Sequence, residues 1–179
     1  MKIFSIIFLS AISFFSCETI PEFNPVKDQK TLPVIEAQID NDNYQMLLEN
    51  RLGNTNVPVK LLYNERLING NIEPSGAGSR YFSKWSYLVR TSNGIIENQN
   101  TFNLSAQVYD RTFTKTTLAS YIFAALGFPL FNSSEIFLIL NNKNKGIYKL
   151  LERVDQDFFI KRQLPVYELI KVRFDAKFS

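Results

Sequence analysis

The chain of 179 residues lacks histidine and contains a single cysteine, Cys17. Without imidazole groups, acid–base catalysis by histidine and histidine-ligated metal sites are excluded. A lone cysteine cannot form a disulfide within the chain. Candidate chemistry therefore falls to carboxylates, lysines and backbone amides. This set suits phosphoryl transfer, which depends on positioning and on neutralisation of charge.

The sequence also has no long block of basic residues and no internal repeat. It contains 20 Lys and Arg residues against 17 Asp and Glu residues, a net charge of +3. A charge this close to neutral, without a basic cluster, does not indicate a nucleic-acid-binding groove, and we expect no nucleic-acid partner. Residues 32–179 are long enough for one domain with a core, and the chain is rich in aromatic residues, with 16 Phe and 8 Tyr.

The N-terminus has the features of a bacterial export signal. Lys2 precedes the apolar run IFSIIFLSAISFF, which ends at Ser16 and Cys17. A basic start, a short apolar run and a small residue before the cleavage point are typical of a signal peptide, and a buried core helix is the weaker interpretation. The pair Ser16-Cys17 resembles a lipobox. We predict a signal at 1–16, a lipidated and palmitoylated Cys17, and a tether at 17–31 that anchors the exported protein at the cell envelope or surface.

Alternation of apolar residues predicts strands in the first half of the chain. We expect extended segments at 32–39, 57–68 and 85–90. The second would end in a turn at 69–71 (NGN), and the third in a turn at 92–94 (SNG). These segments indicate an antiparallel sheet.

The clearest predicted helix covers residues 112–126. Its apolar residues recur at helical spacing, Gly127 follows it, and Asp110 is a candidate cap. Shorter helical segments are expected at 44–51 and 155–161, the latter with its first residue as the cap.

The last part of the domain is predicted to contain a hairpin and a final strand. Two mostly apolar arms at 135–140 and 146–152 flank a polar Asn/Lys turn, and 166–172 follows a proline as an extended segment. The order of elements predicts an α+β fold with a mainly antiparallel sheet and one principal helix.

Several motifs give the chain a family resemblance. They are SGAGSRYFSKWSY at 75–87, DRTFTKTTLASYIFAALGFP at 110–129, GIYKLLERVD at 146–155 and VYELIK at 166–171. In this order they resemble the spore coat protein H (CotH) kinase-like family, secreted bacterial proteins with an atypical protein-kinase fold. The resemblance implies that 32–179 is the N-terminal lobe of that fold. It also implies ATP, with Mg²⁺ or Mn²⁺, as cofactor for phosphorylation of a surface or coat protein.

The resemblance also nominates nucleotide-binding residues in the first motif. The backbone at Gly76, Gly78 and Ser79 would approach nucleotide phosphates, and Lys84 would neutralise their charge. The alternatives are an ordinary turn and a lysine that keeps a strand edge soluble.

Two further residues are nominated in the later motifs. Glu152 would lie on an inward strand face and would need a cationic partner there. That partner would be Lys84 or Lys171, as in kinase Lys–Glu pairs, or Arg111 or Arg153 in a purely structural ion pair. Lys171 would lie near the lobe connection and the nucleotide.

In the family, metal-binding aspartates follow the last of these motifs. Only residues 172–179 remain there, and Asp155, Asp157 and Asp175 do not match the catalytic positions. We therefore expect a truncated lipoprotein that is inactive alone, with no metal site of its own and no assigned catalytic residue. The alternative is a cell-surface interaction module, because an incomplete domain exposes an apolar face.

Overall fold

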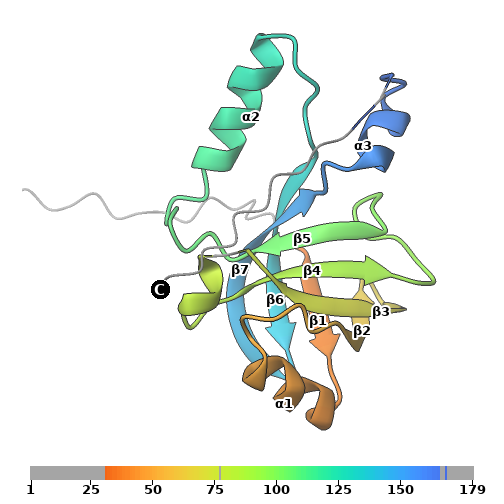
Figure 1. Cartoon of the computed structure of the whole chain (residues 1–179), viewed down its shortest axis with the longest axis vertical. Coiled ribbons are helices and arrows are strands. Elements are labelled where there is room, and N and C mark those ends of the chain that lie inside the picture. The colour runs from red at the N-terminus through yellow and green to blue at the C-terminus, as the bar shows by residue number, and fades with distance from the viewer. Residues whose placement is uncertain (1–30, 77, 166–167, 169–179) are drawn as a thin grey trace, which may run out of the picture. The chain divides into compact units, whose positions relative to one another are not determined.

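The computed structural model describes residues 31–76, 78–165 and 168 (Figure 1). The strands are β1 (Val34–Gln38), β2 (Val57–Tyr63), β3 (Arg66–Ser75), β4 (Ser86–Thr91), β5 (Thr101–Ser105), β6 (Ser133–Leu140) and β7 (Lys143–Glu152). The helices are α1 (Asn41–Glu49), α2 (Lys115–Ala125) and α3 (Gln156–Lys161), with a 3₁₀ turn η1 (Ser79–Tyr81).

The strands close into one barrel in the order β1-β2-β3-β4-β5-β7-β6. Neighbouring strands are antiparallel except for β1 and β6, which are parallel. In that pair Ile35 lies opposite Leu138 and Ala37 opposite Leu140, and all four side chains are buried. The pairing of β1 with β6 therefore both closes the sheet and contributes to its core.

The closed barrel corrects the predicted fold class. The expectation was an α+β, kinase-like lobe built from an antiparallel sheet and one principal helix. The described residues instead form a mixed seven-stranded barrel with three short helices. Closure depends on a parallel pairing between segments far apart in the chain, and local periodicity carries no information about such a pairing.

The barrel interior is apolar. Burial alternates residue by residue along β2, where Val57, Val59 and Leu61 point inward, and β5 adds the fully buried Phe102 and Leu104. Burying one such side chain contributes about 1.5–3 kcal/mol relative to leaving it exposed. The apolar core therefore stabilises the barrel. Polar side chains at the ends of the barrel are not part of this core and can serve other roles.

Several local predictions are confirmed. The expected strands at 32–39 and 85–90 correspond to β1 and β4, and the expected hairpin corresponds to β6 and β7. The three expected helical segments correspond to α1, α2 and α3, and Asp155 caps α3 by accepting a hydrogen bond from the Asp157 amide. The expected strand at 166–172 lies outside the described residues, apart from residue 168.

The predicted extended segment at 57–68 is divided between β2 and β3, and the turn predicted after it, at 69–71, is wrong. Those residues lie inside β3, and the chain reverses at Asn64 and Glu65, whose φ angles of 48° and 63° are left-handed. Gly70 has a different role, because a Cβ atom there would lie 2.3 Å from the Arg90 carbonyl oxygen on β4. The glycine allows the two strands to pass closely.

Helix α2 exposes most of its apolar side chains, whereas Ser120 is buried. The exposed residues on and just after the helix are Leu118, Tyr121, Ile122, Phe123, Leu126, Phe128 and Leu130. We call this set the α2 apolar surface. Within the described part of the chain, no helix has the length and apolar character needed to cross a membrane.

Candidate functional site

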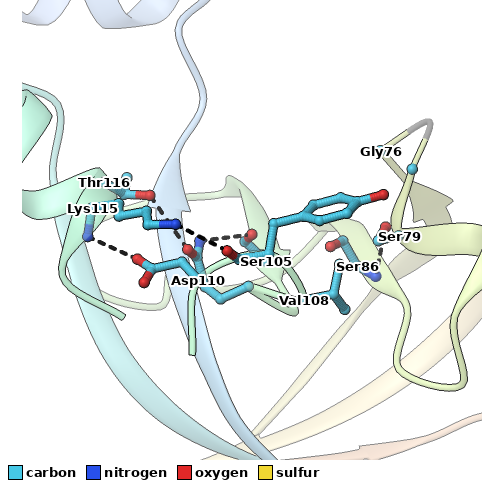
Figure 2. A pocket seen from close by; sticks show the side chains of 11 residues that line it. Gly76, Ser79, Ser86, Ser105, Val108, Asp110, Lys115 and Thr116 are labelled. Atoms are coloured by element: carbon cyan, nitrogen blue, oxygen red, sulfur yellow. Dashed lines mark hydrogen bonds between the residues drawn. The ribbon is translucent and has the colours of Figure 1, made fainter. Parts of the chain in front are cut away.

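A pocket of about 400 Å³ lies between the turn after β3 and the start of α2 (Figure 2). We call it the β3–α2 pocket. Ligand sites in proteins have volumes of about 300–1,000 Å³, so this pocket can hold a small molecule. It is lined by Gly76, Gly78, Ser79, Ser86, Ser105, Gln107, Val108, Tyr109, Asp110, Lys115 and Thr116.

The turn after β3 forms the small-residue side of the pocket. Gly76 has a φ of +78°, a conformation that glycine adopts without steric cost. The buried Ser79 hydroxyl donates to the Ser75 carbonyl at 2.9 Å and accepts from the Ser86 amide at 3.3 Å. These bonds hold the turn against the start of β4. The structure thus brings together Gly76, Gly78 and Ser79, three of the residues nominated from the sequence.

Asp110 organises the opposite side. Its carboxylate accepts from the Lys115 amide at 2.7 Å, from the Thr112 hydroxyl at 2.6 Å and from the Thr112 amide at 3.2 Å. The Thr112 hydroxyl is the main reason that the pKa of Asp110 lies below its usual value, because the lowering bonds outweigh the effect of desolvation. Thr114 occupies the N-cap position of α2 but makes no side-chain capping bond. Asp110 instead accepts the hydrogen bond of the Lys115 amide, the first amide of the helix.

Lys149 ties the start of α2 to the barrel. Its side chain on β7 is fully buried, and Nζ donates to the Phe113 carbonyl at 2.7 Å and to the Thr117 hydroxyl. Nζ also lies 3.0 Å from Oε1 of Glu135 on β6. Three acceptors match the three ammonium protons, which offsets the cost of burying the charge. Phe113 has a φ of 59°, unusual for a bulky residue. The position of the first turn of α2, a wall of the pocket, therefore depends on Lys149.

Lys84 lies apart from the nominated turn residues. Its Nζ donates to the Ile147 carbonyl, and it lies 4.4 Å from the centre of the Tyr148 ring and 5.5 Å from that of Phe113. Burial lowers the pKa of the Lys84 ammonium. The structure thus places this charge against β7, and Lys84 is absent from the pocket lining as described.

Glu152, at the end of β7, forms a paired contact with Arg162. The two guanidinium nitrogens lie 2.6 and 3.1 Å from its carboxylate oxygens, and the Asn132 amide donates to the same carboxylate at 2.9 Å. Burial raises the pKa of Glu152, but the bonds from Arg162 and Asn132 outweigh it and leave the pKa below its usual value. Glu152 therefore joins the end of the barrel to α3.

Two of the predicted partners of Glu152, Lys84 and Arg153, make other contacts. Lys84 lies against the Tyr148 ring, and Arg153 pairs with Asp155 at 3.3 Å. No sequence pattern singled out Arg162, because its approach to Glu152 depends on how α3 packs. Lys171 and Cys17 lie outside the described residues, so their predicted roles stay predictions.

Sequence reasoning missed several pocket residues. Tyr109 and Lys115 lie close to Asp110 in the chain, so a wider search around that motif would have included them. Ser105 belongs to β5, a strand that the sequence analysis did not predict. Among residues 31–76, 78–165 and 168, no three acidic or cysteine side chains gather as metal ligands.

Comparison with known proteins identifies the family. The family model described as CotH kinase protein matches residues 72–179, which include both sides of the β3–α2 pocket. The chain belongs to the CotH family. This CotH-family chain is 27% identical over 160 residues to inner spore coat protein H of Bacillus subtilis (strain 168). The match covers 86% of the chain and 43% of the relative, so the chain spans less than half of that protein's length. The predicted family membership is confirmed.

Proposed function

We propose that this chain binds ATP in the β3–α2 pocket and serves ATP-dependent phosphorylation of a surface or coat protein. One observation carries the proposal: Gly76, Gly78 and Ser79, nominated from the sequence for nucleotide contact, line a pocket large enough for a ligand. Family membership supports the same activity, since the matching family model is described as a kinase protein.

The lining fits a nucleotide better than it fits a metal ion. Asp110 is the carboxylate among the described lining residues, and both of its oxygens already accept hydrogen bonds that hold α2. Mg²⁺ or Mn²⁺ would accompany ATP in the proposed activity. The residues of this chain bind and orient the nucleotide.

We further propose that lipid on Cys17 anchors the protein at the cell envelope or surface. A multiply acylated cysteine holds a domain firmly at a membrane. The relative from Bacillus subtilis is named as an inner spore coat protein, and this supports association with a coat or surface layer.

A second candidate is an interaction module without catalysis. The α2 apolar surface favours it, because exposed apolar patches of this kind often mark contacts with partners. The two candidates differ in whether nucleotide binds.

The test is calorimetric titration of the full chain with ATP, with and without Mg²⁺. Ser105→Phe places a ring in the pocket lining without changing the inward residues of β5. Thr101→Phe is the matched control, because it lies on the same face of β5 outside this pocket. We expect the wild type and Thr101→Phe to bind ATP, and Ser105→Phe to bind at least about tenfold more weakly, a loss of about 1.4 kcal/mol.

Absence of ATP binding by the folded wild-type chain would contradict the proposal and favour the interaction module. Equal ATP affinity of Ser105→Phe and Thr101→Phe would place the nucleotide elsewhere.

A further inference from the structure

The β3–α2 pocket carries little positive charge for a triphosphate. Among its described lining residues Lys115 is the cation and Asp110 the anion, so the formal charges cancel. Lys115 Nζ also already donates to the Tyr109 carbonyl at 3.2 Å. Strong phosphate sites combine several charge-assisted hydrogen bonds, usually from Arg or Lys. The pocket is therefore a poor match for a chain of phosphates.

Two nearby cations are directed away from the pocket. Lys84 contacts the Ile147 carbonyl and the Tyr148 ring. Arg80, next to Ser79 in the chain, donates to the carbonyls of Leu52 and Gly53, each at 2.8 Å. Both charges are committed to the fold, and neither residue is part of the lining.

Tyr109 gives the pocket a surface for an aromatic ligand. Its side chain lines the pocket, yet the residue is 69% exposed. A Cβ atom added to Gly78 would lie 2.7 Å from the Tyr109 hydroxyl, so the ring packs closely beside this glycine. The Phe82 ring meets it edge-on, with centroids 5.3 Å apart. These contacts position the ring and leave much of it open for a ligand ring to stack.

The polar groups around Tyr109 suit an uncharged ring with hydrogen-bonding edges. Gln107 donates to the Ser105 hydroxyl at 2.9 Å, which presents an amide and a hydroxyl on one side of the pocket. The Ser86 hydroxyl oxygen accepts from the Ala106 amide at 3.0 Å, so its hydrogen can be donated to a ligand. Figure 2 shows Ser86 and Ser105 on the strands between the glycine turn and the start of α2.

We propose that the β3–α2 pocket binds the nucleoside end of the nucleotide, with the base stacked on Tyr109 and the phosphates outside the pocket. The inference rests on the proposed binding of ATP. It reverses the sequence-based assignment, which placed the phosphates at Gly76, Gly78 and Ser79. The lack of a side chain at Gly78 instead lets the tyrosine ring lie close against the turn.

The test compares adenosine, ATP and inorganic tripolyphosphate as ligands of the full chain. Adenosine is expected to bind within about tenfold of ATP, and tripolyphosphate is expected not to displace it. Tyr109→Ala should lose about fivefold to 150-fold in affinity for adenosine, the range found for base stacking on aromatic side chains, and Tyr109→Phe should retain the wild-type affinity.

Tyr121→Ala is the matched control, because Tyr121 is 64% exposed on α2 and is not part of the lining. Near-ultraviolet circular dichroism checks that each variant is folded. Binding of ATP and tripolyphosphate without binding of adenosine would overturn this inference and leave the proposed function in place. The same follows if folded Tyr109→Ala binds adenosine as the wild type does. Failure of all three ligands to bind would contradict the proposed function itself, and this inference with it.

Discussion

Replacing Lys149 by methionine should loosen the attachment of α2 to the barrel. The substitution Lys149→Met keeps most of the side-chain volume, so the cavity that it leaves in the fully buried site is small. It removes the donor to the Phe113 carbonyl and to the Thr117 hydroxyl. Glu135 is 43% exposed, so its carboxylate keeps contact with water when the ion pair is lost.

The size of the effect follows from these contacts. Hydrogen bonds that involve a charged group contribute about 1.5–3 kcal/mol each, and two of them are lost. The ammonium no longer has to be buried, and this relief offsets a large part of the loss. We therefore expect the free energy of unfolding to fall by about 1–3 kcal/mol.

Urea unfolding with comparison of m-values measures that change, and amide hydrogen exchange locates it. Exchange should accelerate in the first turn of α2 more than in the central strands. The control is Lys143→Met at the exposed start of β7, with an expected change within about 0.5 kcal/mol. Unfolding of Lys149→Met at the wild-type urea concentration, with unchanged exchange in α2, would show that Lys149 does not hold α2 to the barrel.

Three other predictions concern the end of the barrel, the β3–β4 contact and the N-terminus. Because the pKa of Glu152 is lowered in the folded state, its contact with Arg162 stabilises the fold above about pH 4 and stops doing so as the pH falls through the folded-state pKa. In Arg162→Met, the free energy of unfolding measured in urea should change less between pH 7 and pH 3 than it does in the wild type. An equal change in both proteins would contradict this cause. Gly70→Ala should lower the free energy of unfolding, measured in urea, by more than about 2 kcal/mol, because the added Cβ atom would meet the Arg90 carbonyl. A decrease below about 0.5 kcal/mol would show that the two strands can move apart. Metabolic labelling with a palmitate analogue should mark the wild type and not Cys17→Ser, and label on both would place lipid elsewhere.

The sequence predicted those elements whose characteristic pattern spans only a few neighbouring residues. Apolar alternation marked β1, and Asp155 marked the start of α3 by capping it. The motif around Gly76 and Gly78 pointed to one side of the β3–α2 pocket. In each case the physical cause is local, either the period of a strand, a side-chain cap or a backbone conformation.

What the sequence could not predict depends on contacts between distant segments. The parallel pairing of β1 with β6 closes the barrel, yet neither strand shows it by itself. β5 was missed because Phe102 and Leu104 are its only fully buried apolar residues, too short a pattern to stand out. The charged partners of Lys149 and Glu152 lie on other elements of the fold, and they come close only when these elements pack together. Lys84 is likewise absent from the pocket lining because it contacts Ile147 and Tyr148 on β7.

An NMR titration of the isotope-labelled full chain with ATP reports whether nucleotide occupies the β3–α2 pocket. The amide signals of Gly76, Gly78, Tyr109 and Thr116 are expected to shift with a common dissociation constant, while those of Lys143 and Lys145 in the first residues of β7 stay in place. Unchanged pocket signals, or shifts confined to other parts of the barrel, would contradict binding of nucleotide in this pocket.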